Sequence, residues 1–281
     1  GGVRKRGVKR GLEASCGRRV GPATLAWLGF AGRGARGVDA VLVFGSGSAP
    51  EHRDRVAVVF PSDQLGESLV AALSPRRFYA RLRADERFVG TGQLNVEAVT
   101  TVDGGRALRI FNRGNGTKGS VTSSVDVPTD AMLGYLARVR SNPDAECDVP
   151  FLRPTRYDLG ADNGFPISIG DAVSVPKGPR GREVVVGAFV AEATKDATAD
   201  GATSGTQIGA HLGDGRLIVT PLMEGSGPSA LKIEGLEVRS ALWRDGRLTL
   251  EVLGVVDSDS SDPNARSTLV TIEVVYVARN R

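Results

Sequence analysis

The sequence is poor in the residue types on which common catalytic and structural sites depend. Its two cysteines, Cys16 and Cys147, are far apart and show no Cys-x-x-Cys spacing, which excludes a zinc ribbon and a disulfide-rich scaffold. Its two histidines, His52 and His211, lie in unrelated contexts, and no Gly-x-Ser-x-Gly motif is present, which excludes a serine hydrolase of the α/β type. The glycine-rich "GSGS" at 45–48 lacks the Lys-Ser/Thr of a phosphate-binding loop.

Long apolar runs and aromatic residues are also scarce. No stretch reaches the roughly eighteen apolar residues that a membrane-spanning helix needs, so no membrane partner is expected. The 37 glycines outnumber the nine Phe, four Tyr and two Trp, which indicates many turns. With 281 residues the chain is long enough to bury a sizeable core.

The positive charge is concentrated at the start of the sequence. Residues 1–20 carry seven Lys or Arg side chains against Glu13, whereas the whole chain has a net charge of +4. A nucleic-acid partner is one interpretation of "VRKRGVKR". No aromatic side chains are interleaved for base stacking, so we interpret the segment as a solvated surface and do not expect nucleic acid to bind.

An acid recurs inside apolar alternations that are otherwise typical of buried strands. It is Glu13 in "RGLEASCGR", Glu97 in "LNVEAVTTV", Asp171 in "SIGDAVSVP" and Glu234 in "LKIEGLEVR". In each unit a glycine-rich turn, a long apolar strand that ends in small polar residues, a loop and a third strand follow. A fourth strand is indicated at 67–74, 155–160 and 215–222, and the last unit has none.

An irregular repeat longer than about forty residues favours a β-propeller over a solenoid. The sequence therefore predicts an all-β fold, a single propeller domain over residues 1–281, with about four blades of a five- or six-bladed ring and an N-terminal blade missing. Two inserted helices are expected, near 75–84 with Ser74 as the cap and near 130–140 with Thr129 or Asp130 as the cap.

An ordered series of motifs resembles a known family. "RKRGVKRGLEA", "FGSGSAPEHR", "LNVEAV", "FNRGN", "YDLG", "GDAVSVP", "KIEGLEVR" and "VVDSDSSDP" resemble an uncharacterised bacterial β-propeller family that is distantly similar to phytase-like esterase propellers. The resemblance covers nearly the whole chain. Residues 14–38 depart from it, because they do not read as the expected strand and turn.

In a propeller the first strand of each blade lines a central channel, so the four acids are expected to converge there. The candidate catalytic residues are Glu97 and Glu234. The remaining candidates are a metal set of Glu13, Glu97, Asp171 and Glu234, and ligand-binding residues Asn95, Asn112, Arg113, Asn115, Lys232, Glu192 and Asp257.

Converging carboxylates repel one another, so something must compensate for their charge. A Ca²⁺ or Mg²⁺ ion is one solution, because hard cations take oxygen ligands. Pairing with Lys9, Lys232 or Arg113 is a second, and hydrogen bonds from backbone N–H groups of the next blade are a third.

Two functions from different classes remain open at this stage. The first is a propeller that binds, or hydrolyses, an oxygen-rich ester, lactone or phosphoester, without an organic cofactor and as a monomer. The second is a non-catalytic scaffold for protein interaction, since propellers carry many functions. Thermal stability that responds to a chelator would favour the first.

Overall fold

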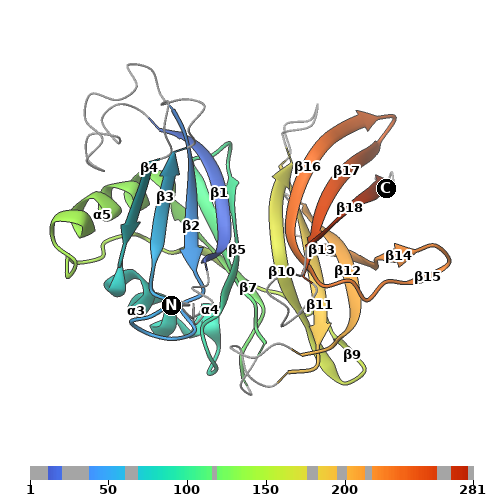
Figure 1. The fold of residues 1–281 in the computed structure, drawn as a ribbon, viewed down its shortest axis with the longest axis horizontal. Coiled ribbons are helices and arrows are strands. Elements are labelled where there is room, and N and C mark those ends of the chain that lie inside the picture. Colours follow the sequence, from blue (N-terminus) through green and yellow to red (C-terminus); the bar gives the residue numbers. More distant parts are fainter. Residues whose placement is uncertain are drawn as a thin grey trace, which may run out of the picture.

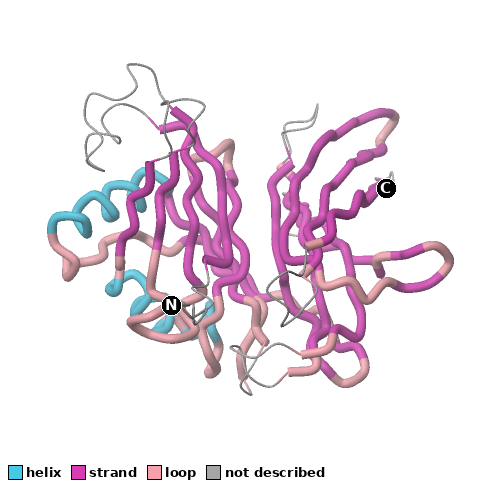
Figure 2. The backbone as a smooth tube through the Cα atoms, viewed as in Figure 1, coloured by secondary structure: helices cyan, strands magenta, loops and turns pink. Residues whose placement is uncertain are grey.

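The computed structural model describes residues 12–20, 38–60, 69–115, 119–175, 183–194, 201–212, 217–257 and 267–277. Over these residues the protein is mostly β, with three helices and five antiparallel sheets (Figures 1 and 2). The predicted all-β class is confirmed at this level. None of the described helices has the length or apolar run needed to cross a membrane. The basic segment 1–11 lies outside the described residues.

Two four-stranded sheets come first along the chain. The first consists of β1 (Leu12–Val20), β2 (Val38–Gly45), β3 (Val56–Phe60) and β4 (Leu69–Leu73). The second consists of β5 (Val96–Val102), β6 (Ala107–Asn112), β7 (Ser123–Pro128) and β8 (Leu152–Arg156). Strand β1 spans 12–20, so part of the stretch 14–38, for which the sequence indicated no strand, is a strand. Residues 21–37 lie outside the described part.

The remaining sheets follow in chain order. The third contains β9 (Ala161–Asp162), β10 (Phe165–Val175), β11 (Val184–Glu192), β12 (Thr203–Leu212) and β13 (Leu217–Pro221). The small hairpin sheet contains β14 (Met223–Glu224) and β15 (Gly227–Pro228). The last contains β16 (Ile233–Arg244), β17 (Arg247–Val256) and β18 (Thr268–Val277).

The four large sheets are neighbours through their first long strands. Strand β5 contacts both β1 and β10, and β10 contacts both β5 and β16. Within each sheet the strands pair antiparallel with their sequence neighbours. The four acid-bearing strands therefore lie next to one another in the middle of the molecule (Figure 1).

Apolar layers fill the spaces between neighbouring sheets. The largest layer lies between the first two sheets and includes fully buried Phe44, Phe60 and Ile110. A second layer joins the second and third sheets, and a third joins the third and last sheets. Strand β11 lies between two of these layers, which explains why all nine of its residues are buried and why its sequence is apolar throughout.

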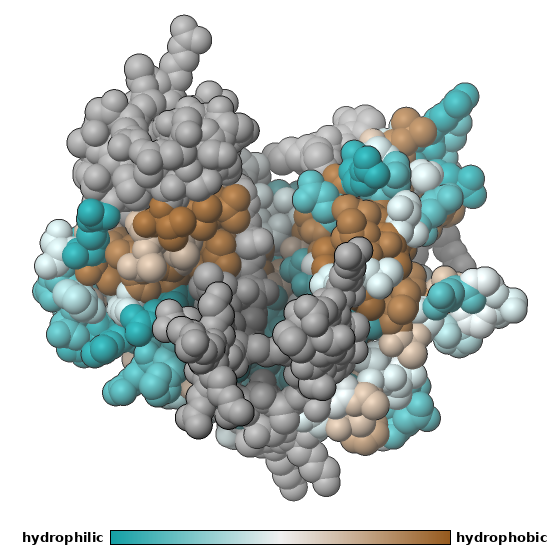
Figure 3. Space-filling view, viewed as in Figure 1, coloured by the Kyte–Doolittle hydropathy of each residue, from teal (hydrophilic) through white to brown (hydrophobic). Residues whose placement is uncertain are grey.

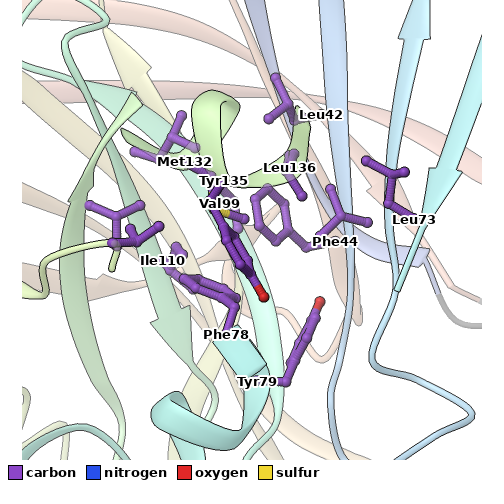
Figure 4. Packing of buried hydrophobic residues seen from close by; sticks show 14 of the residues in the cluster. Leu42, Phe44, Leu73, Phe78, Tyr79, Val99, Ile110, Met132, Tyr135 and Leu136 are labelled. Carbon is purple, nitrogen blue, oxygen red and sulfur yellow. The ribbon is translucent and has the colours of Figure 1, made fainter. Parts of the chain in front are cut away.

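Helices add aromatic side chains to the first layer (Figure 4). Helix α3 (Arg76–Ala84) buries Phe78, Tyr79 and Leu82, and α5 (Thr129–Ser141) buries an apolar stripe that includes Tyr135. The rings of Phe78 and Tyr79 meet edge to face, with their centroids 5.8 Å apart. Both helices were predicted to within about two residues, which is the usual uncertainty of helix ends.

The predicted helix caps are wrong. Pro75 precedes α3 and Pro128 precedes α5, and neither helix start has a side-chain cap, so Ser74 does not cap α3. Thr129 is the first residue of α5, and its hydroxyl donates instead to the Gly105 carbonyl at 2.9 Å. The short helix α4 (Glu86–Val89), capped by the Asp85 carboxylate, was not predicted.

Candidate functional site

Each acid-bearing strand contains a bulge, and the bulge explains the acid. The pairing register shifts between Leu12 and Ala14 in β1, between Val96 and Ala98 in β5, and between Ile233 and Gly235 in β16. The extra residues are therefore Glu13, Glu97 and Glu234. A bulged residue leaves the ladder and its side chain is re-aimed, so an acid at this point need not enter an apolar layer. The side chain of Glu13 lies outside the described part.

The third sheet differs by one residue. Its bulge lies between Ile169 and Asp171, so Gly170 occupies the extra position and Asp171 follows it. A Cβ atom on Gly170 would lie 2.6 Å from the carbonyl oxygen of Ile233, which is closer than real Cβ contacts. The close approach of β16 therefore requires glycine here, and the acid stands next to the bulge.

Arg113 connects the second and third sheets through two acids. Its Nη2 donates to the Glu192 carboxylate at 2.6 Å, and its Nη1 lies 3.5 Å from Glu97 Oε1. Nε donates to the Ser168 hydroxyl at 3.4 Å. The Arg113 side chain is 5% exposed, so its guanidinium group loses most of its hydration on folding. The two carboxylates compensate for that loss.

Lys232 extends the same network to the last sheet. Its Nζ lies 3.0 Å from Glu192 Oε1 and 3.2 Å from Glu234 Oε1. The Gly201 backbone N–H also donates to Glu192 Oε1, at 3.0 Å. Charges therefore alternate in the order Glu97, Arg113, Glu192, Lys232, Glu234 across three sheets.

Asparagines surround Glu97. The side-chain N–H₂ of Asn95 donates to Glu97 Oε1 at 2.7 Å and to Asn115 Oδ1 at 3.0 Å. The Asn112 amide bonds backbone groups at both ends: its Oδ1 accepts from Asn95 N, and its Nδ2 donates to the Val121 carbonyl, both at 2.8 Å. The buried Oδ1 of Asn95 has no hydrogen-bond partner among the described residues.

Asp171 joins the third and last sheets. Its Oδ2 accepts the backbone N–H of Leu236 at 2.7 Å, which is the backbone arrangement considered for the acids from the sequence. Burial raises the pKa of Asp171 to about 7. Backbone hydrogen bonds from Ala172 and Leu236 lower this pKa, and the charges of Glu97 and Glu234 raise it.

The pKa of Glu234 is also raised. Burial raises its pKa to about 7, Lys232 and Arg113 counteract the rise, and the charges of Glu97 and Asp257 add to it. Burial alone would lower the pKa of Arg113, but Glu97, Glu192 and Glu234 outweigh it and raise that pKa. Burial thus raises the pKa of two carboxyl groups from neighbouring sheets to about 7.

An open cavity of 840 Å³ borders these two acids. Its wall includes Asp171 and Glu234, followed along β16 by Gly235, Leu236, Glu237, Val238 and Arg239. Leu253, Val255 and Leu269 from β17 and β18 complete the other side. The cavity wall therefore combines acidic side chains from β10 and β16 with apolar side chains from β17 and β18.

A divalent cation shared by the acids finds no support in the described part of the chain, which does not include the Glu13 side chain. The described residues contain no group of three or more His, Cys, Asp or Glu side chains placed to hold one ion. The positive charge that Ca²⁺ or Mg²⁺ would supply comes instead from Arg113 and Lys232, the pairing considered from the sequence. Lys9, the other candidate partner, lies outside the described residues.

Most residues singled out from the sequence meet here. Asp257 lies near the network: its backbone N–H donates to the Lys232 carbonyl at 2.9 Å, and its charge acts on Glu234. Ser168 and Gly201 were missed, because a serine or glycine inside a strand or loop carries no distinctive pattern.

A second buried ion cluster was also missed. The Asp126 carboxylate, fully buried, accepts from Arg109 Nε at 2.7 Å and Nη2 at 2.9 Å, and from Arg153 Nε at 2.7 Å. Arg109 also lies 3.2 Å from His211 Nδ1 on the third sheet. The cross-strand pairing of Arg109 with Asp126 was the available signal, and it requires the strand register to be known.

Comparison with known proteins gives a family without an assigned activity. A comparison with curated proteins finds no match. A family model described as a family of unknown function (DUF6910) matches residues 24–261. The match does not include a link to propellers or to phytase-like esterases, so that part of the resemblance stays a prediction. The chain belongs to this family of unknown function, DUF6910.

Proposed function

We propose that the four large sheets are successive blades of a β-propeller. Three features support this arrangement: each sheet is an antiparallel meander, the first long strands β1, β5, β10 and β16 are neighbours, and an apolar layer separates each pair of sheets. The bulged acids then lie along the line where the inner strands meet.

The function that the geometry supports best is the binding and hydrolysis of a small ester or lactone in the 840 Å³ cavity. One observation carries it: Asp171 and Glu234, from two neighbouring sheets, stand in the cavity wall and both have a pKa of about 7. A carboxyl group that titrates near the working pH is suited to act as a general acid or base.

The cavity wall favours an ester or lactone over a phosphoester. Asp171, Glu234 and Glu237 all line the cavity, with Arg239 as the positive side chain, which disfavours an anionic substrate. Leu253 and Val255 offer an apolar surface for an acyl chain or ring.

Glu234 and Asp171 divide the chemistry in this proposal. Ionised Glu234 takes a proton from water, whose oxygen attacks the carbonyl carbon of the substrate. The bond from that carbon to the leaving oxygen breaks, and protonated Asp171 gives its proton to the leaving oxygen. Glu97, held by Asn95 and Arg113, acts by raising the pKa of both acids.

A substitution at Glu234 tests this proposal. Glu234→Gln keeps the size of the side chain and removes the base, so turnover of small ester and lactone substrates should fall about 10²- to 10⁴-fold. Glu146→Gln, at an 85% exposed side chain in an ion pair with Arg77, is the matched control and should keep full activity. Wild-type turnover should peak near pH 7, where one of the two acids is ionised.

A metal-dependent version is tested in the same preparation. Melting temperatures of the wild type, Glu97→Gln and Glu234→Gln are measured with Ca²⁺, Mg²⁺ and chelator. If Ca²⁺ raises the wild-type melting point and both substitutions abolish the rise, the site holds a cation and the metal-free mechanism is wrong. If the wild type hydrolyses none of the esters and lactones tested, the hydrolytic proposal is wrong.

The second candidate is a non-catalytic scaffold, and one observation favours it. The network pairs Glu97, Glu192 and Glu234 with Arg113 and Lys232, and Asp171 bonds the backbone of β16. Such pairs can hold three sheets in register without any ligand. A scaffold predicts that Glu234→Gln leaves the binding of every small molecule unchanged.

A further inference from the structure

Strand β18 is an edge that lacks the usual protection against pairing. Among the described strands it pairs with β17 alone, on the outer side of the last sheet (Figure 1). It is ten residues long, and its sequence "TLVTIEVVYV" contains no Pro, Gly, Lys or Arg. A long edge of this composition offers unpaired N–H and C=O groups to another strand.

The outer edges of the other large sheets are protected. Strand β8 has five residues, among them Pro154 and two arginines. Strand β13 also has five residues and ends at Pro221. Strand β4 has five residues and lies beside α5. Proline, charge, shortness and a covering helix are the devices by which proteins block edge pairing. Within the described part of the chain β18 has no proline, no basic side chain and no covering helix, and Glu273 is its single charged residue.

The sequence of β18 is self-complementary about Ile272. In an antiparallel pair of identical strands centred on this residue, Leu269 of one copy faces Val275 of the other, and Val270 faces Val274. Thr271 then faces Glu273, so no like charges are opposed. A centre at Glu273 would set two carboxylates opposite each other, which is destabilising.

The exposed face supports the same pairing. Leu269 is 63% exposed and Val275 is 43% exposed, and Figure 3 shows a hydrophobic patch over this part of the molecule. Both side chains point away from the apolar layer that contains Ile272. In the antiparallel pair each Leu269 covers a Val275, so two apolar contacts form on this face.

We propose that β18 pairs with β18 of a second copy of this chain, antiparallel and centred on Ile272, to join two three-stranded sheets into one of six strands. The occupant is a second copy because the apolar and polar positions of the strand match their own reversal. The sequence-based expectation of a monomer is the alternative outcome.

Sedimentation velocity over a range of protein concentrations tests the proposal. The wild type should shift from monomer to dimer as its concentration rises. Leu269→Lys should weaken dimerisation at least about tenfold, because the two-fold axis repeats the lost contact. Leu242→Lys, at a 61% exposed position of the same sheet on the opposite edge strand β16, is the matched control and should leave the dimer unchanged.

A charge pair tests the register. Val275→Glu alone should weaken the dimer as Leu269→Lys does, and the double variant should restore it, since each new lysine then faces a new glutamate of the other copy. Melting curves check that all variants remain folded. A wild type that is monomeric at every concentration, equal loss with Leu242→Lys, or no rescue in the double variant would overturn the proposal.

Discussion

Strands β11 and β17 occupy corresponding places in consecutive sheets, yet their surroundings differ. Every residue of β11 is buried, whereas β17 alternates between buried and exposed positions along its whole length. The third sheet is enclosed by a neighbour on each face, and the described part of the chain covers one face of the last sheet. Burial on two faces, rather than position in the sheet, therefore determines whether such a strand is uniformly apolar.

The largest effect expected from this comparison is at Phe189 of β11. Phe189→Ala removes a ring that is 3% exposed and lies against the backbone of Gly187 and Gly209, so the free energy of unfolding should fall by about 3–5 kcal/mol. Val255→Ala on the open face of β17 should cost less than about 1 kcal/mol. Denaturant melts measure both, and equal losses would contradict the two-face interpretation.

The next effect concerns the spacing between the two sheets. Gly170→Ala places a Cβ atom 2.6 Å from the Ile233 carbonyl oxygen, so β10 and β16 must separate, and a loss of about 1–3 kcal/mol is expected. Gly235→Ala meets the Val255 side chain at 3.2 Å on the open face, where the neighbour can move, and should cost less. A larger loss of unfolding free energy for Gly235→Ala than for Gly170→Ala would contradict this interpretation.

A third test concerns the pH dependence of stability at the joint between these sheets. The pKa of Asp171 is about 7 in the folded protein and near 4 for an exposed carboxyl, so the folded state retains a proton that the unfolded state has released. The contribution of Asp171 to the free energy of unfolding therefore decreases progressively as the pH rises from about 4 to about 7.

Asp171→Asn should flatten that dependence. The amide oxygen can still accept the Leu236 N–H, so the melting temperature of the variant should fall less than that of the wild type between pH 5 and pH 8. Asp148→Asn, at a 74% exposed side chain paired with Arg138, serves as the control. Parallel curves for Asp171→Asn and the wild type would show that the carboxyl is not held in its neutral form.

The sequence predicted the repeat well because apolar alternation and glycine turns are local signals. It located Glu97 and Glu234 at the start of their sheets, and it located α3 and α5 by their apolar spacing. The alignment of Asp171 with these glutamates is one residue away from the structural equivalence, because Gly170 occupies the bulge. A bulge is a property of two paired strands, so one strand's sequence does not reveal it.

The pairing inside the site was predictable only as one of several options. Lys232 lies two residues before Glu234, and Arg113 follows the strand that pairs with the strand of Glu97, but their shared partner Glu192 comes from a different sheet. The acidic cavity depends on how β16 lies against β10, which is a long-range contact. Such contacts follow from the packing of whole sheets rather than from any local pattern.

Each large sheet is made from one uninterrupted stretch of chain, with strands paired in the order in which they are synthesised. A sheet can therefore form as soon as its last strand leaves the ribosome, because no strand waits for a distant partner. Its apolar face, in contrast, stays bare until the following sheet has been translated. Translation speed between consecutive sheets thus sets how long each bare face is open to other nascent chains.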